Sequence, residues 1–313
     1  MKLNKRLKKG ELTTEQIVLL IILILSFAVI LFFLIKLNLP NQTESQLCHN
    51  SVSLRGTSSV SKNAVPLNCQ KTYICISKTG KCNNPDMNKP TVEKVSNKDE
   101  VYHALAENLA NCWWMYGEGK VNYIGSSTLP KLYCSMCSQI GFDSSVKRIF
   151  GSSTFDKKEF YNYLALTNMS GSSQTYSQYL YGTNNFSKEY KGNFGKVDLT
   201  KQYYSLIGIT SDVSTLSWAA VGAGLGVLGL ATGGLSNLLV LSYVGGAIAV
   251  GSAGGAGASY VFSSLTSGSS NKGVLVAPVK KGESGNEFVL PSLIQVNSPQ
   301  FDGLGCQEIA NKA

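Results

Sequence analysis

The chain is poor in charged side chains and in histidine. Charged residues make up 15% of its 313 residues, below the ~25% typical of soluble domains, and histidine occurs twice. So little histidine disfavours hydrolases built on a Ser-His-Asp or Cys-His arrangement. The net charge is +9, but basic and acidic residues are interspersed, with no basic stripe to indicate nucleic-acid binding. We therefore expect a protein that is not an enzyme and that binds neither a cofactor nor nucleic acid.

Charge is absent from residues 17–35, which are apolar except for Ser26. As a helix this run is roughly 28 Å long, close to the ~30 Å hydrocarbon core of a bilayer. Five basic residues lie within residues 1–9, and basic flanks stay on the cytoplasmic side of a membrane. The sequence predicts a cytoplasmic basic segment at residues 1–15 and a transmembrane anchor helix at residues 16–39.

A second uncharged stretch contains residues 216–262, which are apolar and rich in glycine. As a helix this segment would be about 70 Å long, enough for two crossings, with a break at the glycine pair that starts at Gly233. We predict a transmembrane helical hairpin that returns the tail, residues 263–313, to the outer side, where it packs on the outer domain. A single crossing, favoured by Lys272, and a flexible linker remain the alternatives.

Together these segments predict a multi-pass protein of the cell membrane with a cytoplasmic N-terminus. The main domain, residues 40–215, is then an extracytoplasmic α+β domain, large enough for a core of its own. The expected partners are the lipid bilayer and, through the transmembrane helices, other copies of the chain or other membrane or surface proteins.

Eight cysteines predict a disulfide framework, since seven of them lie in the predicted outer domain. The eighth lies in the tail and would share the same oxidising side, where it can pair with the odd cysteine among the seven. Three glycosylation sequons, at Asn41, Asn168 and Asn185, add weak support for this placement. The cysteines are Cys48, Cys69, Cys75, Cys82, Cys112, Cys134, Cys137 and Cys306.

Cys134 and Cys137 form a C-x-x-C pair, which allows three interpretations. They can be structural cysteines with different partners, a redox-active pair, or zinc ligands together with two of the cysteines at positions 69, 75, 82 and 112. The flanking residues lack the usual partners of a redox pair, and no second C-x-x-C is present. His103 lies four residues before Glu107 on one predicted helix face, but two ligands make no metal site. We favour the structural interpretation and expect no metal.

Residues 96–116 form the clearest helix pattern of the outer domain. Asn97 can cap the helix and Glu100 can close a capping box, while Val101, Leu105 and Leu109 recur at helical spacing. Elsewhere the patterns predict helices at residues 154–166 and 174–181, and a small β-rich unit at residues 47–90 that holds His49 in a loop. Strands are predicted at residues 72–77, 120–125, 199–209, 274–279 and 288–296.

The N-terminal residues KKGELTTE, at positions 8–15, followed at once by the apolar run, resemble the class III signal peptide of type IV pilins. The resemblance implies cleavage between Gly10 and Glu11, which makes Glu15 the fifth mature residue. Pilins carry a glutamate there that pairs with the amino terminus of a neighbouring subunit. Alternatively, Thr13 and Glu15 belong to an ordinary first helical turn, in which a threonine caps and a glutamate complements the helix dipole.

A second resemblance covers residues 111–119, NCWWMYGEG, together with the C-x-x-C pair. These segments resemble uncharacterised archaeal membrane proteins and imply no activity. The sequence therefore predicts a membrane-anchored, disulfide-stabilised cell-surface protein with a structural or interaction role. The alternatives are a type IV pilin-like subunit that assembles through its N-terminal helix and a membrane-tethered thiol-disulfide oxidoreductase that uses Cys134 and Cys137.

Overall fold

The computed structural model describes residues 14–36, 43–58, 62–82, 87, 89–124, 132–210, 238–244, 247–252 and 273–308. The chain divides into two compact units, Met1–Thr43 and Glu44–Ala313. The predicted processing residues Gly10 and Glu11 and the sequon at Asn41 lie outside the described residues.

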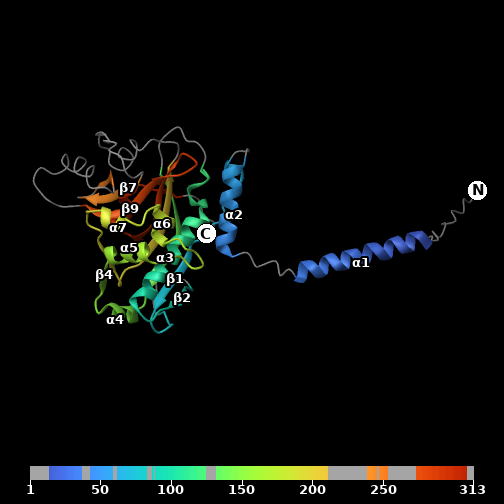
Figure 1. Ribbon diagram of the computed structural model, residues 1–313, viewed down its shortest axis with the longest axis horizontal. Helices are drawn as coiled ribbons and strands as arrows, with labels where there is room; N and C mark the ends of the chain where they lie inside the picture. The colour runs from blue at the N-terminus through green and yellow to red at the C-terminus, as the bar shows by residue number, and fades with distance from the viewer. Residues whose placement is uncertain are drawn as a thin grey trace, which may run out of the picture. The chain divides into compact units, whose positions relative to one another are not determined.

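The first unit contains helix α1, Thr14–Lys36, which runs without a break (Figure 1). Across the described residues, no helix combines the length and apolarity that a membrane crossing requires. This finding contradicts the anchor predicted at residues 16–39 and the predicted multi-pass location in a cell membrane.

The second unit is an α+β domain built on one mixed sheet. Among the described residues nine strands join it, in the order β2-β1-β3-β6-β10-β9-β7-β8, with β11 paired to β3. The pairs β1–β2, β1–β3 and β3–β11 are parallel, and the other pairs are antiparallel. The strands from the N-terminal side are β1 (Thr72–Ser77), β2 (Thr91–Lys94), β3 (Leu132–Phe142) and β6 (Tyr203–Thr210). The later strands are β7 (Leu238–Val244), β8 (Ala247–Ser252), β9 (Val274–Lys281), β10 (Glu287–Gln295) and β11 (Gln307–Glu308).

Helix α3, Lys98–Met115, is the longest helix of this unit and forms where its sequence pattern predicts it. The Asn97 side chain accepts a hydrogen bond from the Glu100 backbone N–H at 2.9 Å and caps the first turn. The Glu100 carboxylate in turn accepts from the Ser96 backbone N–H at 2.7 Å. Val101 and Leu105 are fully buried, as their helical spacing predicts, so α3 lies with one face on the sheet.

Shorter helices surround α3 and the small β4–β5 ladder. The helices are α2 (Glu44–Thr57), α4 (Lys147–Phe150), α5 (Lys157–Leu166), α6 (Tyr176–Tyr181), α7 (Phe186–Glu189) and α10 (Pro299–Gly303). The 3-10 turns are η1 (Lys62–Ala64), η2 (Gly117–Gly119) and η3 (Ser144–Val146), and the small ladder pairs β4 (Thr154–Asp156) with β5 (Lys196–Asp198).

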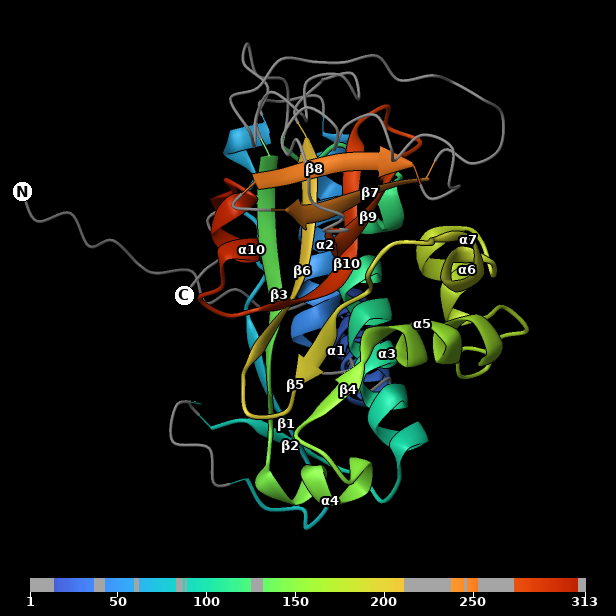
Figure 2. The same ribbon diagram turned by 90° about the vertical axis from the view of Figure 1, so that its left-hand side faces the viewer.

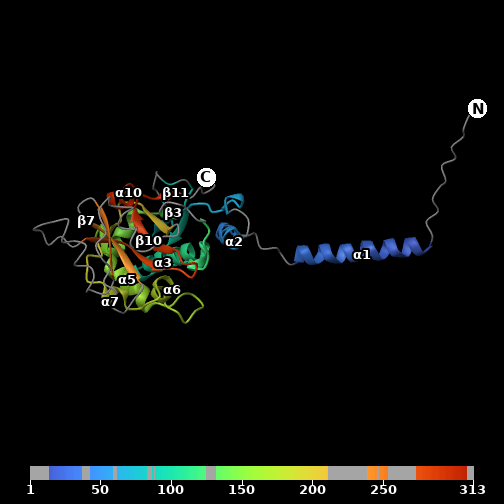
Figure 3. The same cartoon turned by 90° about the horizontal axis from the view of Figure 1, so that it is seen from above.

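The sheet separates two apolar clusters. In Figure 2 and Figure 3, α3, α5 and α6 lie on one side of β10, and α10 lies on the other. The larger cluster joins the inner face of α3 to the aromatic side chains of α5, α6 and α7. The smaller cluster contains Leu132, Leu206 and Val289 of the sheet together with Leu304, the residue that follows α10. The central strands β6 and β10 are therefore buried on both faces, which explains their nearly continuous apolar runs.

The predicted transmembrane hairpin at residues 216–262 is wrong where the structure describes it. Residues 238–244 and 247–252 are the antiparallel strands β7 and β8, and β7 pairs with β9. Glycine has a low helix propensity, whereas Val, Ile and Tyr favour strands. The ladder with β9 supplies hydrogen bonds to the β7 backbone, so the segment extends the sheet. The remaining residues of 216–262 lie outside the described residues.

The two strands predicted in the tail form, since β9 and β10 lie within the sheet of the second unit. Two smaller predictions are wrong. The segment at residues 47–90 is not wholly β-rich, because α2 occupies its start and carries His49. Residues 120–124 form no strand in the part of the chain described there.

All eight cysteines form disulfides, which confirms the predicted framework. The bridges are Cys48–Cys69, Cys75–Cys82, Cys112–Cys137 and Cys134–Cys306. The tail cysteine thus has a partner in the main domain, as predicted. The last bridge spans 172 residues of sequence, whereas the second spans 7.

We expect the double variant Cys134→Ala/Cys306→Ala to lose more stability than Cys75→Ala/Cys82→Ala. Loop-closure entropy gives about 5 kcal/mol for the longer loop and about 2 kcal/mol for the shorter one. The two pairs are matched, since each joins a buried cysteine to a partly exposed one. Urea unfolding of both variants measures the difference. Equal losses would contradict a role for the long bridge in joining β3 to the tail.

Candidate functional site

The C-x-x-C pair does not act as a unit in the structure. The Cys134 side chain lies in the apolar cluster beside α10, and the Cys137 side chain lies in the cluster beneath α3. Each bonds to a different partner, Cys306 and Cys112 respectively. A redox-active pair bonds its two cysteines to each other, so this geometry supports the structural interpretation.

The described residues contain no candidate metal site either. Within the described ranges, no three His, Cys, Asp or Glu side chains gather closely enough to hold an ion. The cysteines that a zinc site would need are held in disulfides.

The most unusual backbone of the main domain directly follows α3. Gly117, Glu118 and Gly119 have φ values of 75°, 56° and 75°, three left-handed residues in succession. A β-carbon at Gly117 would lie 2.9 Å from Val121, and one at Gly119 would lie 3.0 Å from Trp113. Glycine is therefore required on both sides, and a glutamate between them carries strain on the order of 1 kcal/mol. We call residues 116–120 the Glu118 turn.

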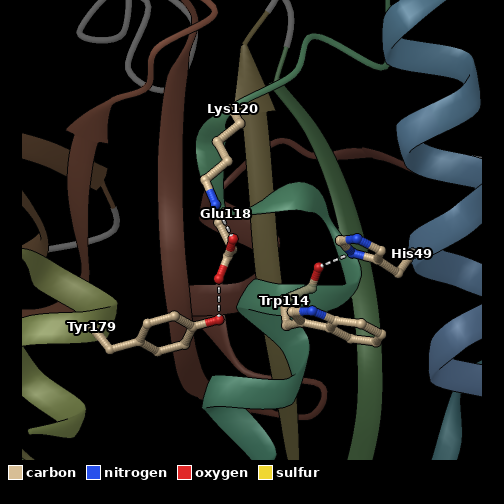
Figure 4. A network of polar contacts seen from close by, with 5 residues as sticks. All are labelled: His49, Trp114, Glu118, Lys120 and Tyr179. Carbon is tan, nitrogen blue, oxygen red and sulfur yellow. Dashed lines mark hydrogen bonds and ion pairs between the residues drawn. The ribbon is translucent and has the colours of Figure 1, made fainter. Parts of the chain in front are cut away.

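The Glu118 carboxylate holds this turn to a distant helix (Figure 4). The Tyr179 hydroxyl of α6 donates to Glu118 Oε1 at 2.7 Å, and the Lys120 ammonium pairs with Oε2. The Glu118 side chain is 20% exposed. Burial alone would raise the Glu118 pKa, but the hydrogen bonds from Lys120 and Tyr179 hold this pKa below its ordinary value.

The same turn also contacts the β9–β10 connection. The Gly119 carbonyl accepts the Glu283 backbone N–H at 2.9 Å. A β-carbon at Gly282 would lie 2.3 Å from that carbonyl, so the two backbones meet at closest approach. The Glu118 turn therefore ties α3, α6 and the tail strands together.

On the other side of α3, His49 of α2 lies on Trp114 (Figure 4). The two rings stack at 4.2 Å with an interplanar angle of 6°, and His49 Nδ1 lies 2.6 Å from the Trp114 carbonyl oxygen. This contact needs a proton on Nδ1, because a carbonyl oxygen only accepts. This contact fastens α2 to α3, while the Cys48–Cys69 bridge ties α2 to the segment that precedes β1.

A second polar cluster confirms the shared helix face of His103 and Glu107. The Tyr176 hydroxyl of α6 donates to Glu107 and lies 3.2 Å from His103 Nδ1. The Ser170 hydroxyl also donates to Glu107, at 3.1 Å. Burial, followed by the hydrogen bond to Glu107, raises the Tyr176 pKa. The two carboxylates that accept hydrogen bonds from α6 therefore belong to Glu107 of α3 and to Glu118 of the turn that follows α3.

The contacts in these clusters join α3 and the turn that follows it to α6 and α2. Both Glu118 oxygens have donors that favour the ionised form, so Glu118 is a poor general base. Sequence reasoning missed Glu118, Lys120, Tyr179 and Tyr176. The Gly-Glu-Gly spacing was the available signal for the turn, because glycines around one acidic residue indicate left-handed backbone.

The predicted sequons at Asn168 and Asn185 are exposed, so their side chains are accessible. Asn168 pairs with Thr175 in an isolated bridge at a surface turn, and Asn185 precedes α7. Their glycosylation stays a prediction.

The largest apolar surface belongs to α1. Every described side chain from residue 15 to residue 29 is exposed, including Leu19 at 66% and Leu23 at 62%. Glu15, in its first turn, is the one charged residue in this range. Contiguous apolar surface of this kind marks an interaction site.

No protein-family model, curated protein or solved structure matches the chain. The assignment of a role therefore rests on the geometry described above.

Replacing Glu118 with Gln should destabilise the protein at neutral pH by about 1.5 kcal/mol, because a charge-assisted pair becomes neutral. The pKa of Glu118 is depressed on folding, so its contribution is present above the unfolded pKa and is lost as pH falls through the folded one. Denaturant unfolding from pH 7 downward should show the difference between wild type and variant shrink below about pH 4.5.

Glu93→Gln, on the exposed strand β2, is the matched control and should change stability little at any pH. A double-mutant cycle with Tyr179→Phe should show coupling to Glu118→Gln. If the losses of stability are additive, the hydrogen bond between Glu118 and Tyr179 does not stabilise the contact between the Glu118 turn and α6.

Proposed function

We propose that this chain is a structural subunit that associates with further copies of itself through α1, as a type IV pilin-like subunit does. The observation that carries the proposal is the exposed apolar surface of α1, residues 17–29. The disulfide-stapled unit, Glu44–Ala313, is then the domain that the assembly displays.

The pattern of α1 favours a bundle of like helices over a single docking groove. A helix that packs against one partner keeps a polar face toward water. Between residues 17 and 29 only Ser26 is polar, and its hydroxyl donates to the Leu23 carbonyl at 2.9 Å. Because no face is left for water, several neighbours must surround the helix. Equivalent α1 helices provide such neighbours with the same apolar chemistry.

Glu15 adds a reason for a defined register. It is the acidic residue of the first turn of α1, and it is exposed. After cleavage between Gly10 and Glu11 it would be the fifth mature residue. A carboxylate at that depth in an apolar bundle costs free energy unless it is paired, and a neighbour's terminal amine is a suitable partner.

The four disulfides support a role in an oxidising compartment, where such bridges form and persist. They also favour a display domain that resists unfolding. The thiol-disulfide oxidoreductase alternative draws no support from the geometry, because Cys134 and Cys137 bond to partners on opposite faces of the sheet.

The substitution Leu23→Asp should weaken self-association of the full chain at least about tenfold. It removes a buried leucine contact of about 2 kcal/mol and adds a charge to the interface. Sedimentation velocity over a concentration series measures the change.

Leu166→Asp is the control, because Leu166 is 80% exposed and ends α5 in the other unit. It should leave association unchanged. A wild-type chain that remains monomeric throughout, or equal effects of the two substitutions, would refute assembly through α1.

The mature amino terminus should be Glu11 when the protein is isolated from its native source, as peptide mass spectrometry can read directly. Glu15→Gln should leave this cleavage intact but weaken association of the mature chain, because the charge that pairs with the neighbouring amine is lost. A terminus at Met1 or Lys2 would remove the pilin-like interpretation and leave only association through apolar surface.

A further inference from the structure

A small cavity of about 60 Å³ lies where the first turn of α5 meets β5, β9 and β10. Its polar lining consists of Lys157, Lys196, Tyr203, Gln295 and Gln300, and the remaining wall is aliphatic. None of the described residues that line it is Asp or Glu. The cavity therefore presents two cationic side chains without an acidic one.

The cavity exists because β9 and β10 separate. Their ladder runs from Lys281 paired with Glu287 to Val279 paired with Val289 and stops there. Beyond that point β10 continues beside β6, after a register shift between Val289 and Ser292, while β9 continues beside β7. The backbone of β10 that faces the opening lacks a β9 partner, so its carbonyls need other donors.

Lys157 supplies one such donor. Its ammonium nitrogen donates to the Leu293 carbonyl oxygen at 3.1 Å. This contact uses one of three N–H groups and brings no negative charge to the ammonium. Burial without a counter-charge lowers the Lys157 pKa to about 8.

Two carboxylates of the β4–β5 ladder accept hydrogen bonds outside the cavity. Asp156 Oδ1 accepts the Lys158 backbone N–H at 2.8 Å, and Asp156 lies opposite Lys196 in the β4–β5 ladder. Asp198 Oδ1 accepts from the Thr200 backbone and hydroxyl. The Asp198 backbone N–H donates to the Tyr203 hydroxyl at 2.7 Å, so that oxygen accepts and its own proton remains available.

We propose that this cavity is a binding site for a small oxyanion, held by the ammonium groups of Lys157 and Lys196 and by the Tyr203 hydroxyl. The cavity holds about the liquid volume of two waters, which suits a phosphate or a carboxylate group. A lysine ammonium binds such anions as a point charge. A bound anion in turn offsets the desolvation free energy of the buried ammonium. This site is independent of association through α1, because it lies wholly within the Glu44–Ala313 unit.

Inorganic phosphate is the first probe, used on the full chain with chloride at matched ionic strength as reference. Phosphate should slow acetylation of the Lys157 amine by acetic anhydride at pH 8. At ten times its dissociation constant the rate should fall about tenfold, as peptide mass spectrometry reads site by site. Lys201 is the internal control, because it is exposed and lies outside the cavity.

Repeating the acetylation experiment with acetate in place of phosphate distinguishes a general oxyanion site from one that requires phosphate. Protection by both anions, or by phosphate alone, supports the proposal and identifies the ligand chemistry. Equal acetylation of Lys157 in phosphate and in chloride overturns it.

The variant Lys157→Met gives a second readout. Phosphate should raise the melting temperature of the wild type and of Lys201→Met, but not that of Lys157→Met. An equal rise in all three proteins would mean that Lys157 only completes the backbone of β10, and the site would be refuted. The acetylation result on the wild type stands even if Lys157→Met fails to fold.

Discussion

The main domain depends on the double pairing of β6. This strand pairs with β3 on one side and with β10 on the other, both antiparallel. It thereby joins the N-terminal strands to β10, which follows it by about eighty residues, and through β10 to β9. Because both faces of β6 are covered, its residues from Ser205 to Thr210 are buried without a polar face. The helices on one side of the sheet and α10 on the other therefore pack against the same central strands.

Side-chain contacts with α3 hold the other helices in place on their side of the sheet. Helix α6 has only six residues and could not persist alone. Two of its tyrosines, Tyr176 and Tyr179, donate to carboxylates of α3 and of the turn behind it. On the opposite flank, the His49–Trp114 stack and the Cys48–Cys69 bridge hold α2. A single long helix thus positions α6 through charge-assisted hydrogen bonds and α2 through a ring stack. Apolar packing and the Cys112–Cys137 bridge hold the same helix to the sheet.

Prediction from sequence succeeded where a local pattern was sufficient. The cap at Asn97 and the apolar spacing that follows are local, so α3 could be placed almost to the residue. The tail strands are short runs rich in Val, Leu and Ile, so they could be found, and cysteine parity predicted a partner for Cys306. The same local reasoning failed for the part of residues 216–262 that the structure describes, the strands β7 and β8. An apolar, glycine-rich composition is common to membrane helices and to strands buried in a sheet, and only the ladder with β9 separates them.

The candidate sites were harder to foresee because their members come from distant parts of the chain. Lys157 is one lysine among many in the sequence. Its setting arises from residues near positions 196, 203 and 293, and it follows from the place at which β9 and β10 part. Helix α2 was missed for a different reason. It is largely polar with only three buried residues, so it shows no apolar stripe for a pattern to detect.

The Cys134–Cys306 bridge has a further consequence for the glycine-rich stretch of the chain. The two cysteines enclose residues 135–305, which include that stretch in full. A protease that cuts once anywhere inside this loop leaves two fragments that remain covalently joined through β3 and the tail. Paired strands on both sides of β6 would hold the fragments in register as well. The protein can therefore be nicked in this loop and still migrate as one molecule until the disulfides are reduced.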